Sequence, residues 1–380
     1  MGGRGMTVLR GMTWDHPRGY ECIVAASAEY ARTTGVEIRW EKHPLSAFEE
    51  APIEQLAAHN DLMVMDHPHI PQAAEAGAFA PLDGHGHDDA LAALAAQSVG
   101  ASHATYAYDG RQYGLATDAA AQVAVYRPDL IADPPRDWDA VLELAAEGRV
   151  VWPSNAVHAL SSLVTLTAND GAPPTSEPGV FLDEEAARGA LETMHRLAEL
   201  VPQENLSQNP IDVAEMLATS DTYVYAPLSY GYVNYSRPGF RANRLQHIDI
   251  PAGASGVSGS QLGGAGIAVS ASARDLDAAR AFAIWLASPD VQRGVYYDGG
   301  GQPGYAPAWD DDRLNDDSLD FFRGTRATLE GASVRPRFSG WPEFQNWASV
   351  WANQALRREI TDEELLRRFR DAAEELLTRD

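Results

Sequence analysis

The chain is short of cysteine, of basic residues and of long apolar runs. Cys22 is the only cysteine among 380 residues, so the chain forms no internal disulfide, no cysteine-based metal site and no CxxC redox pair. Its 29 basic residues stand against 54 acidic ones, which gives a formal net charge of −25. A surface this acidic repels nucleic acid and anionic lipid, which are bound by basic footprints. No run of about 18 apolar residues occurs, so we expect no membrane-spanning helix.

Several motifs of catalysis and nucleotide binding are also missing. The sequence contains no P-loop, no GxSxG elbow, no HExxH pair and no GxGxxG after a strand. These absences leave a P-loop NTPase, an elbow-type serine hydrolase, a zincin protease and a dinucleotide-binding enzyme without support in the sequence.

What the chain does have is enough apolar sequence for two folded domains. Hydrophobic residues make up 45% of it, and 380 residues exceed one ordinary core. Its first third alternates strand and helix patterns, with strands over residues 7–14, 36–40 and 61–65 and a helix from Tyr20 to about Gly35. Helical patterns form the C-terminal end. We therefore expect the α/β class.

The first helix has a regular apolar face. Tyr20, Ile23, Val24, Ala28 and Ala31 share it at the 3.6-residue period, which predicts that this face points inward. The single cysteine falls on the other, polar side, in the first helical turn. A thiolate would be stabilised there, so this residue is either a reactive thiol or an inert small side chain.

Polar side chains gather where two predicted strands end. One cluster follows the strand over residues 7–14, and the other follows the strand over 61–65. In open α/β sheets, ligand sites form outside the carboxyl ends of strands. Tryptophan stacks on sugar rings, carboxylates accept from hydroxyl groups, and arginine or histidine donates. The structural alternatives are a helix-entry turn capped by Asp15 and an Asx-type turn before Pro68. We predict that both clusters bind ligand, through Trp14, Asp15, His16, Arg18, Asp66 and His67.

Further candidates lie later in the chain. Asp118 stands where the chain is expected to cross to the second domain, and a carboxylate there suits hydroxyl recognition. Trp152 ends a predicted strand and is either a second stacking platform or a core residue. Ser229 and Tyr230 follow another predicted strand and are candidates for ligand contact. His158, on an otherwise apolar helix, is interpreted as a buried histidine whose hydrogen bonds are satisfied.

Short segments spread along the chain carry a family resemblance. They are the opening strand with Trp14, Arg18–Tyr20, Asp61–Asp66, Gly77–Asp83, Gly110–Asp118, Val125–Leu130, Gly263–Ser270, Ala279–Leu286, Ser288–Gln292 and Gly301–Gly304. In this order and spacing, over nearly the whole chain, they resemble the extracellular solute-binding proteins of ABC transporters, family 1, of the sugar-binding type.

The resemblance implies a type II periplasmic-binding-protein-like fold, with two hinged α/β lobes, a central cleft and a helical C-terminus. The implied lobes are residues 1–117 with 266–314 and residues 118–265 with 315–380, hinged near Gly263 and residues 312–317. The implied function is capture of a small polyhydroxylated solute, a carbohydrate or polyol, by a monomer that delivers it to ABC permease subunits. No catalysis and no cofactor are implied. Gly264, Gln302 and Trp341 join the expected ligand-binding residues.

Two other functions stay open. Asp15, His16, Asp66 and His67 could serve an enzyme built on the same two-lobe fold, with or without a metal ion. The same groups with His69 could capture a metal ion or a metal chelate, because histidine and carboxylate suit Zn, Mn and Fe. Their spacing matches no metal-binding signature.

The start of the chain carries no recognisable export signal. Residues Met1–Gly5 are few and glycine-rich, and a strand follows almost at once. We expect an extracellular or periplasmic location if a leader has been removed, and a cytoplasmic location otherwise.

Overall fold

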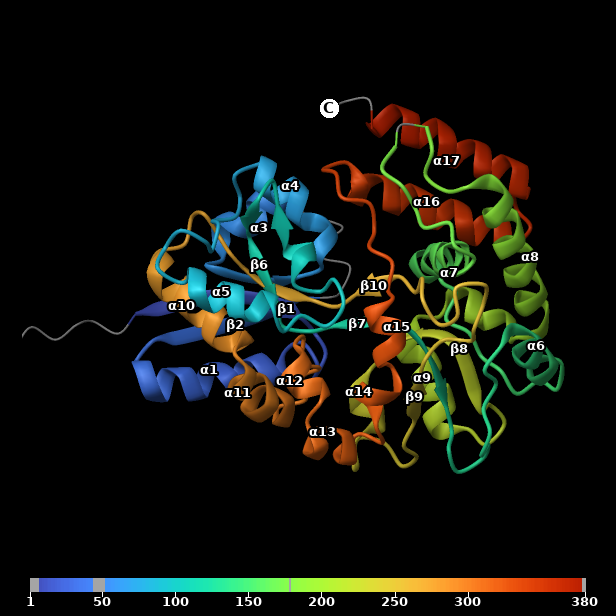
Figure 1. Cartoon of the computed structure of the whole chain (residues 1–380), viewed down its shortest axis with the longest axis horizontal. Helices are drawn as coiled ribbons and strands as arrows, with labels where there is room; N and C mark the ends of the chain where they lie inside the picture. Colours follow the sequence, from blue (N-terminus) through green and yellow to red (C-terminus); the bar gives the residue numbers. More distant parts are fainter. Residues whose placement is uncertain (1–6, 44–51, 178, 378–380) are drawn as a thin grey trace, which may run out of the picture. The chain divides into compact units, whose positions relative to one another are not determined.

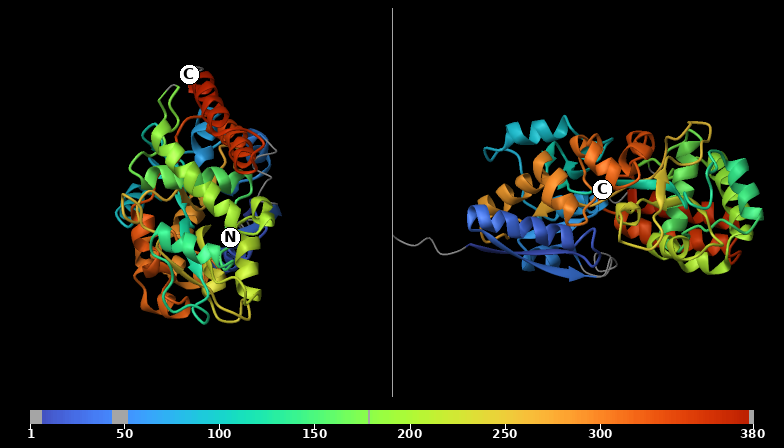
Figure 2. Two further views of the ribbon diagram at one scale, coloured as in Figure 1. Left: turned by 90° about the vertical axis from the view of Figure 1, so that its right-hand side faces the viewer. Right: turned by 90° about the horizontal axis from the view of Figure 1, so that it is seen from below.

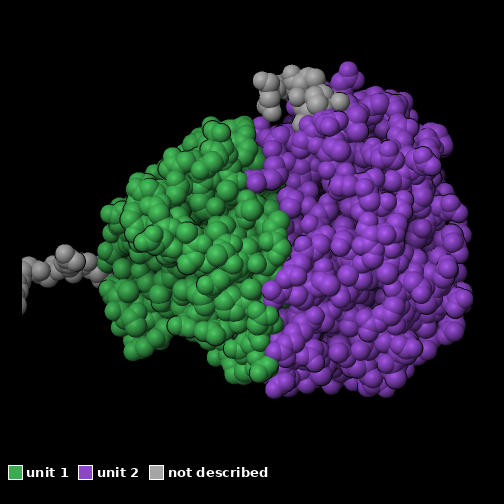
Figure 3. All heavy atoms as spheres, in the orientation of Figure 1, with its two compact units in different colours: residues 1–119, 264–314 green, residues 120–263, 315–380 purple. Residues whose placement is uncertain are grey.

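The computed structural model describes residues 7–43, 52–177 and 179–377, so Met1–Gly5 lies outside the described residues. The chain forms two compact α/β units, each assembled from two stretches of sequence (Figures 1 and 3). Unit 1 comprises Met1–Ala119 and Gly264–Leu314, and unit 2 comprises Ala120–Gly263 and Asn315–Asp380. These crossings differ by at most two residues from the expected lobe boundaries.

Unit 1 is built on a five-stranded sheet in the order β2-β1-β3-β11-β6. Strand β1 (Val8–Trp14) runs parallel to β2 (Glu37–His43) and β3 (Leu62–Met65). Strand β11 (Gly266–Val269) runs antiparallel to both β3 and β6 (Gly114–Ala116). The carboxyl ends of β1, β3 and β6 therefore meet at one edge of the sheet, together with the start of β11.

Helices cover both faces of this sheet. Along β3, Leu62 and Val64 belong to the core on one face, whereas Met63 and Met65 belong to the core on the other. This alternation in a wholly apolar strand is expected where both faces are buried. Helices α1 (Glu21–Thr34) and α10 (Leu276–Ala287) cover the first face, and α3 (Ile53–His59) and α4 (Ile70–Glu75) cover the second. Figure 2 (right) shows α1 lying along β1 and β2.

The inward face of α1 differs from the predicted one. The helix ends where expected, with Gly35 in the left-handed conformation at φ 76°. Val24, however, is 38% exposed, and Ser27 instead accepts a hydrogen bond from Trp40 Nε1 at 2.7 Å. Because alanine and serine are small enough for either face, periodicity alone does not fix the orientation of such a helix. The buried residues are Cys22, Ile23, Ala26, Ser27 and Tyr30.

Shorter elements complete unit 1. Asp109 and Gly110, at φ 45° and 70°, form a two-residue turn between β4 (Ala107–Tyr108) and β5 (Arg111–Gln112). The other elements are η1 (His67–His69), α5 (Asp88–Ala95), η2 (Ala104–Tyr106), α11 (Pro289–Val291), η5 (Gln292–Tyr296), α12 (Ala306–Trp309) and α13 (Asp312–Asp317).

Unit 2 is centred on β7 (Ala120–Tyr126), which pairs antiparallel with β8 (Tyr225–Tyr230), β9 (Gln246–Ile248) and β10 (Leu262–Gly263). Helix α9 (Pro210–Thr219) packs on one face of this sheet. The remaining elements are α6 (Trp138–Ala146), α7 (Ala156–Asn169), α8 (Glu184–Leu200), η3 (Gln203–Ser207), η4 (Val233–Ser236), α14 (Phe321–Gly324), α15 (Arg326–Glu330), α16 (Trp341–Leu356) and α17 (Asp362–Leu377).

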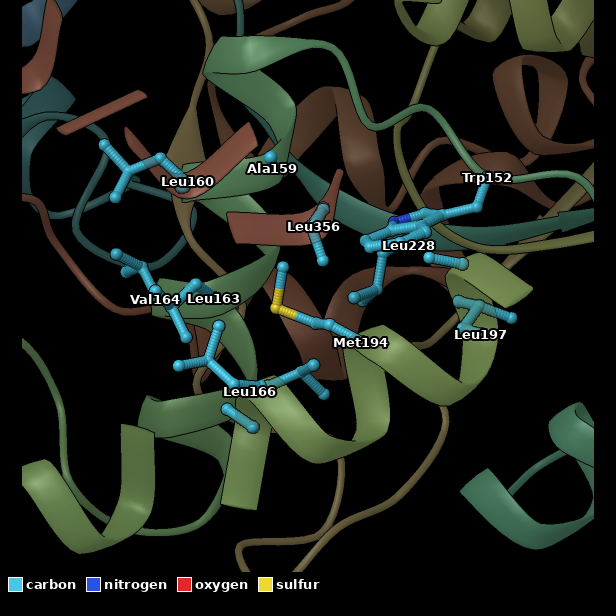
Figure 4. Close-up of a cluster of buried hydrophobic side chains, with 14 of the residues drawn as sticks. Trp152, Ala159, Leu160, Leu163, Val164, Leu166, Met194, Leu197, Leu228 and Leu356 are labelled. Carbon is cyan, nitrogen blue, oxygen red and sulfur yellow. The ribbon is translucent and has the colours of Figure 1, made fainter. Parts of the chain in front are cut away.

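The larger core of unit 2 lies around α7. Figure 4 shows Leu163 and Val164 of α7 in one apolar cluster with Met194 of α8 and Leu356 of α16. Leu163 has no solvent exposure. In the described part of the chain, no helix is both long enough and apolar enough to cross a membrane.

Truncating this core should destabilise the fold. Leu163→Ala is expected to lower the free energy of unfolding by about 2–5 kcal/mol, because it removes buried methyl groups and leaves a cavity. Urea unfolding followed by circular dichroism measures the change. The matched control is Leu200→Ala at the exposed end of α8, for which we expect a loss of about 1 kcal/mol or less. Equal losses for the two variants would contradict this account of the core.

Candidate functional site

One edge of the unit 1 sheet collects most of the predicted ligand-binding residues of that unit. The turn Trp14–Arg18 follows β1, Asp66 and His67 follow β3, and Asp118 follows β6. Because these strands end at the same edge, Arg18 and Asp118, one hundred positions apart, become neighbours. The structure thus brings together the two clusters that the sequence placed at strand ends.

The strongest contact at this edge is a buried ion pair between Arg18 and Asp118. Arg18 Nε donates to Asp118 Oδ2 at 2.6 Å, and Arg18 Nη2 donates to Asp118 Oδ1. The two side chains are only 6% and 0% exposed. The backbone N–H of Asp118 also donates to Ala265 O at 2.9 Å. The parallel, two-bond geometry is the strong form of an arginine–carboxylate contact.

Burial and pairing act in opposite directions on Asp118. Burial raises the pKa of its carboxyl, and the adjacent Arg18 guanidinium opposes that rise. The charge of Asp66 also contributes to raising this pKa, consistent with the shared strand edge. Arg18 therefore compensates a carboxylate that would otherwise be costly to bury.

Trp14 is part of the folded turn. Its side chain is 8% exposed and belongs to the core on the α1 face of the sheet. An added Cβ at Gly19 would come within 2.4 Å of the indole, so only glycine fits beneath this ring. Thr13 Oγ1 donates to Gly19 O at 2.9 Å and closes the same turn. Most of the indole surface is thus used in packing, and its role in ligand stacking stays a prediction.

The other polar groups of this turn also have partners. Asp15 is exposed and accepts a hydrogen bond from Lys42 Nζ at 2.8 Å. His16 is half-buried, and its Nδ1 accepts from the backbone N–H of Arg18 at 3.1 Å. Gly19 and Tyr20 donate their backbone N–H groups to His16 O. The first cluster is therefore both a helix-entry turn and a polar strand end.

Asp66 is the carboxylate of the second cluster and is partly accessible to solvent. Its side chain is 40% exposed, while His67 is buried. Asp66 Oδ1 accepts from the backbone N–H of His67 at 2.8 Å and lies 3.2 Å from His67 Nδ1. The His67 ring meets Tyr106 edge-on, with ring centroids 6.2 Å apart. Asp66 thus presents a carboxylate oriented by its neighbour.

Two more predicted residues lie near the point where the chain leaves unit 1. Gln302 is buried, and its Nε2 donates to Ala119 O at 2.8 Å. Gly264 has φ +102°, a backbone conformation that favours glycine. Gln302 therefore contacts the last residue of the first stretch of unit 1, and Gly264 is the first residue of its second stretch.

Cys22 is an inert core residue. The prediction that it lies on the polar side of the first helix is wrong, because its side chain has no solvent exposure. Burial raises the pKa of the thiol to about 12, so the group stays protonated at neutral pH. Its Sγ donates to Arg18 O at 3.0 Å. The reactive-thiol interpretation of this residue therefore has no support.

The metal-binding alternative receives no geometric support. Within residues 7–43, 52–177 and 179–377, no three histidine, cysteine, aspartate or glutamate side chains gather in a way that could hold a metal ion.

In unit 2, a polar network runs along one side of α7. Trp152 Nε1 and Gln122 Nε2 both donate to Ser162 Oγ, at 3.1 and 3.2 Å. Gln122 Oε1 accepts from Thr165 Oγ1 at 2.6 Å, and Thr165 Oγ1 in turn accepts from the backbone N–H of Gln261 at 2.9 Å. The network joins α7 to β7 and to the segment before β10.

This network positions Tyr230. Gln261 Nε2 donates to Tyr230 Oη at 2.8 Å and to Ser161 Oγ at 2.9 Å. The tyrosine ring lies against Gly263, where an added Cβ would come within 2.6 Å of Cε1. Tyr230 itself is half-buried, so part of its ring remains accessible. A glycine backbone and a glutamine amide thus fix an accessible aromatic ring.

His158 lies beside this ring and was not among the predicted ligand-binding residues. The ring centroids of His158 and Tyr230 are 5.7 Å apart. His158 Nδ1 is buried and has no hydrogen-bond partner in the described part of the chain, so the prediction of a satisfied histidine is wrong. Burial lowers the pKa of His158 from 6.5 to about 4, so the imidazole is neutral at pH 7.

The sequence did contain a signal for this part of the site. Ser161, Ser162 and Thr165 interrupt the apolar helix at spacings that share one side, close to His158. Several hydroxyl groups on one side of a buried helix require hydrogen-bond partners. The sequence therefore indicates that polar side chains pack against this side of the helix, as Gln122 and Gln261 do.

The remaining candidates of unit 2 are buried. Trp152 has no exposure and packs in the core around α7 (Figure 4), which favours the core interpretation left open from the sequence. Ser229 pairs with Val123 inside the sheet. Trp341 is 1% exposed and packs on Phe181 and Phe344, with ring centroids 5.7 and 5.5 Å away. Ligand contact by these three residues stays a prediction.

Replacing only Arg18 of the Arg18–Asp118 pair should lower the free energy of unfolding more than replacing both residues with apolar ones. Arg18→Met leaves a buried, unpaired carboxylate, and we expect a loss of about 3–5 kcal/mol in the free energy of unfolding. The double variant Arg18→Met/Asp118→Leu should lose less than Arg18→Met alone. Urea unfolding at pH 7 measures both. Arg32→Met removes an exposed arginine that pairs with Glu29, and little change is expected there. A double variant less stable than Arg18→Met would overturn this interpretation.

His158 should make stability depend on pH. Its pKa in the folded chain is lower than in the unfolded chain, so the unfolded state binds more protons between pH 6.5 and about 4. Stability is then complete above pH 6.5 and declines as the pH falls through this window, by up to about 1.4 kcal/mol per pH unit. In His158→Gln the decline should be shallower by this amount, whereas the exposed His85→Gln should follow the parent. Parallel curves for the parent and His158→Gln would refute the assignment.

Comparison with known proteins gives a family and a fold. A family model described as bacterial extracellular solute-binding protein matches residues 25–318. No curated protein matches the chain at a significant level. The maltose-bound MalE3 of T. maritima is similar in structure with a TM-score of 0.85 at 16% identity, over 97% of this chain and 100% of that chain.

Two further solved structures agree. A solute-binding protein of an ABC transporter from Thermotoga lettingae, bound to alpha-D-tagatose, gives a TM-score of 0.83 at 17% identity, over 98% of this chain and 100% of that chain. Another from Agrobacterium radiobacter, in complex with ribitol, gives 0.80 at 17% identity, over 97% and 98%. At these identities the likeness shows the fold, which confirms the predicted two-lobe α/β architecture with a helical C-terminus. Since the family model covers more than half of the 380 residues, the chain belongs to the bacterial extracellular solute-binding protein family.

Proposed function

We propose that the chain is the substrate-binding component of an ABC importer and that it captures a small, uncharged, polyhydroxylated solute, a carbohydrate or polyol. The observation that carries the proposal is the internal pairing of the charges at the strand edge of unit 1. Arg18 pairs with Asp118, Asp15 pairs with Lys42, and the Asp66 carboxylate accepts the backbone N–H of His67. A surface whose charges compensate one another suits neutral hydroxyl groups better than an ionic solute.

The groups of unit 2 support the same chemistry. Tyr230 offers a fixed aromatic face, which suits the apolar CH face of a sugar ring. His158 is neutral at pH 7 and carries one donor and one acceptor nitrogen, as hydroxyl recognition requires. The solved structures of similar fold contain maltose, alpha-D-tagatose and ribitol, which are neutral polyhydroxylated molecules.

The rest of the proposal follows from the family. The chain acts as a monomer outside the cytoplasmic membrane and delivers its solute to the transmembrane subunits of a permease. Closure of the two units on the solute, with hinges near Gly263 and Asp312–Asp317, remains part of this proposal. No specific observation favours the enzyme alternative based on Asp15, His16, Asp66 and His67, and no metal-binding cluster is found among the described residues.

Isothermal titration with a panel of neutral sugars and polyols tests the proposal. The panel includes maltose, tagatose and ribitol, together with an amino acid and a dicarboxylate as ionic controls. We expect saturable binding of at least one neutral member and none of the ionic controls. Binding of an ionic control alone, or of no neutral member, would reject the proposal.

Tyr230→Ala should weaken binding of the neutral ligand about tenfold or more, because it removes the stacking face. Tyr230→Phe keeps the ring and should lose less affinity, because it removes only the hydrogen bond that Gln261 donates to Tyr230. Tyr223→Ala is the matched control, since Tyr223 is also a half-buried tyrosine packed on the same apolar cluster, but it precedes β8 whereas Tyr230 ends it. If Tyr230→Ala and Tyr223→Ala bind equally well, Tyr230 is not the stacking residue.

A further inference from the structure

Unit 1 carries a polar pocket at the end of its sheet opposite to the strand edge with Asp66 and Asp118. The pocket has a volume of about 250 Å³ and is lined by Arg10, His59, Asn60, Asp61, Ser272 and Arg274. Asp61 immediately precedes β3, and Ser272 and Arg274 follow β11. The strand edge with Asp66 and Asp118 lies at the other end of these same strands. The pocket is thus separate from the candidate functional site.

Among the described residues that line the pocket, Asp61 is the one carboxylate, and both of its oxygens accept hydrogen bonds. Asp61 accepts hydrogen bonds from the backbone N–H groups of Arg10 and Arg274, at 2.7 and 2.8 Å. It also accepts from Arg274 Nη2 at 2.6 Å and Nε at 3.3 Å. Burial works to raise the pKa of Asp61, but the hydrogen bonds from Arg274 and Arg10 more than offset it, so this pKa lies below its ordinary value. Asp61 therefore stays ionised and fully occupied.

The donors of the pocket are not used up. The Arg10 guanidinium makes no hydrogen bond or ion pair with any described residue, and Arg274 Nη1 makes none either. The Ser272 hydroxyl is likewise unengaged, and His59 uses only Nδ1, which lies 2.8 Å from Gln55 O. The lining therefore has an excess of donors over acceptors, with two guanidinium groups against one carboxylate.

The charge around the pocket is opposite in sign to that of the whole chain. The net charge of the whole molecule is −25, yet Arg10 stands directly opposite Arg39 in the β1–β2 register. Arg39 is paired with Glu37, whose Oε1 accepts from Arg39 Nε at 2.7 Å, whereas Arg10 has no carboxylate partner among the described residues. An anion in the pocket would supply that partner, since arginine donors match oxyanions well.

The backbone around the pocket is held in place. Asp61 N donates to Arg10 O at 2.8 Å, and Ser270 N donates to Asp61 O at 3.0 Å. Ser270 Oγ donates to Ala57 O at 2.7 Å and accepts from Ser272 N at 3.0 Å. The backbone that carries Arg10, Ser272 and Arg274 is therefore held in place, and Asp61 also orients the Arg274 guanidinium.

We propose that this pocket binds a small tetrahedral oxyanion of the size and charge of inorganic phosphate or sulfate. Arg10 and Arg274 supply charged donors from two sides, and Ser272 supplies a hydroxyl donor. The volume is below the roughly 300–1,000 Å³ of pockets for larger organic ligands, which favours an inorganic ion. The proposal is independent of the solute-binding function.

Titration of inorganic phosphate into the full-length protein at low ionic strength and pH 7 tests the proposal, with sulfate and sodium chloride at matched ionic strength for comparison. We expect saturable binding of phosphate and sulfate, and none of chloride. Arg10→Gln should weaken phosphate binding about tenfold, through loss of one charged donor. Ser272→Ala should weaken it by a smaller factor.

The matched control is Arg39→Gln, which removes the same charge from the adjacent strand but lies outside the pocket lining. Its phosphate affinity should stay within about twofold of the parent, because exposed charges at a distance are screened. Absence of saturable phosphate binding overturns the proposal. Equal weakening by Arg10→Gln and Arg39→Gln also overturns it, since that result indicates general electrostatic attraction rather than a site.

Discussion

The buried pair between Arg18 and Asp118 is the constraint on which the strand edge of unit 1 depends. Arg18 stands in the turn between β1 and α1, and Asp118 stands two residues before the chain enters unit 2. Neither charge is tolerable in this buried position without the other. The pair therefore fixes the turn after β1 against the end of β6. The same segment is held by Gln302, which donates to Ala119, and by Ala265, which accepts from Asp118.

This pairing changes the meaning of the charged residues at the start of the chain. Three charged or ionisable side chains within four positions, Asp15, His16 and Arg18, suggest an ionic site when only the sequence is considered. In the structure, Arg18 is neutralised by Asp118 and Asp15 by Lys42, so the net charge offered to a solute is small. The accessible carboxylates are Asp15, which is paired with Lys42, and the partly exposed Asp66. The paired charges of unit 1 and the fixed aromatic ring of unit 2 each suit recognition of a neutral solute.

Helix α7 illustrates how a core helix also contributes to a site. Leu163 and Val164 fill the apolar core of unit 2, whereas Ser161, Ser162 and Thr165 supply hydrogen bonds toward Gln122 and Gln261. Buried hydroxyl groups need such partners, so the network also orients the groups that position Tyr230.

The sequence by itself determined the α/β class, the ends of the main elements and the polar strand ends. These depend on local signals, namely apolar runs in strands and Gly35 at a helix end. Only the tertiary structure decided which face of α1 is buried, because alanine, serine and cysteine fit either environment. It also decided that Asp118 is paired, that Trp341 is covered by phenylalanines, and that His158 has an unsatisfied nitrogen. Each of these properties depends on a partner distant in sequence, which no local pattern of residues can specify.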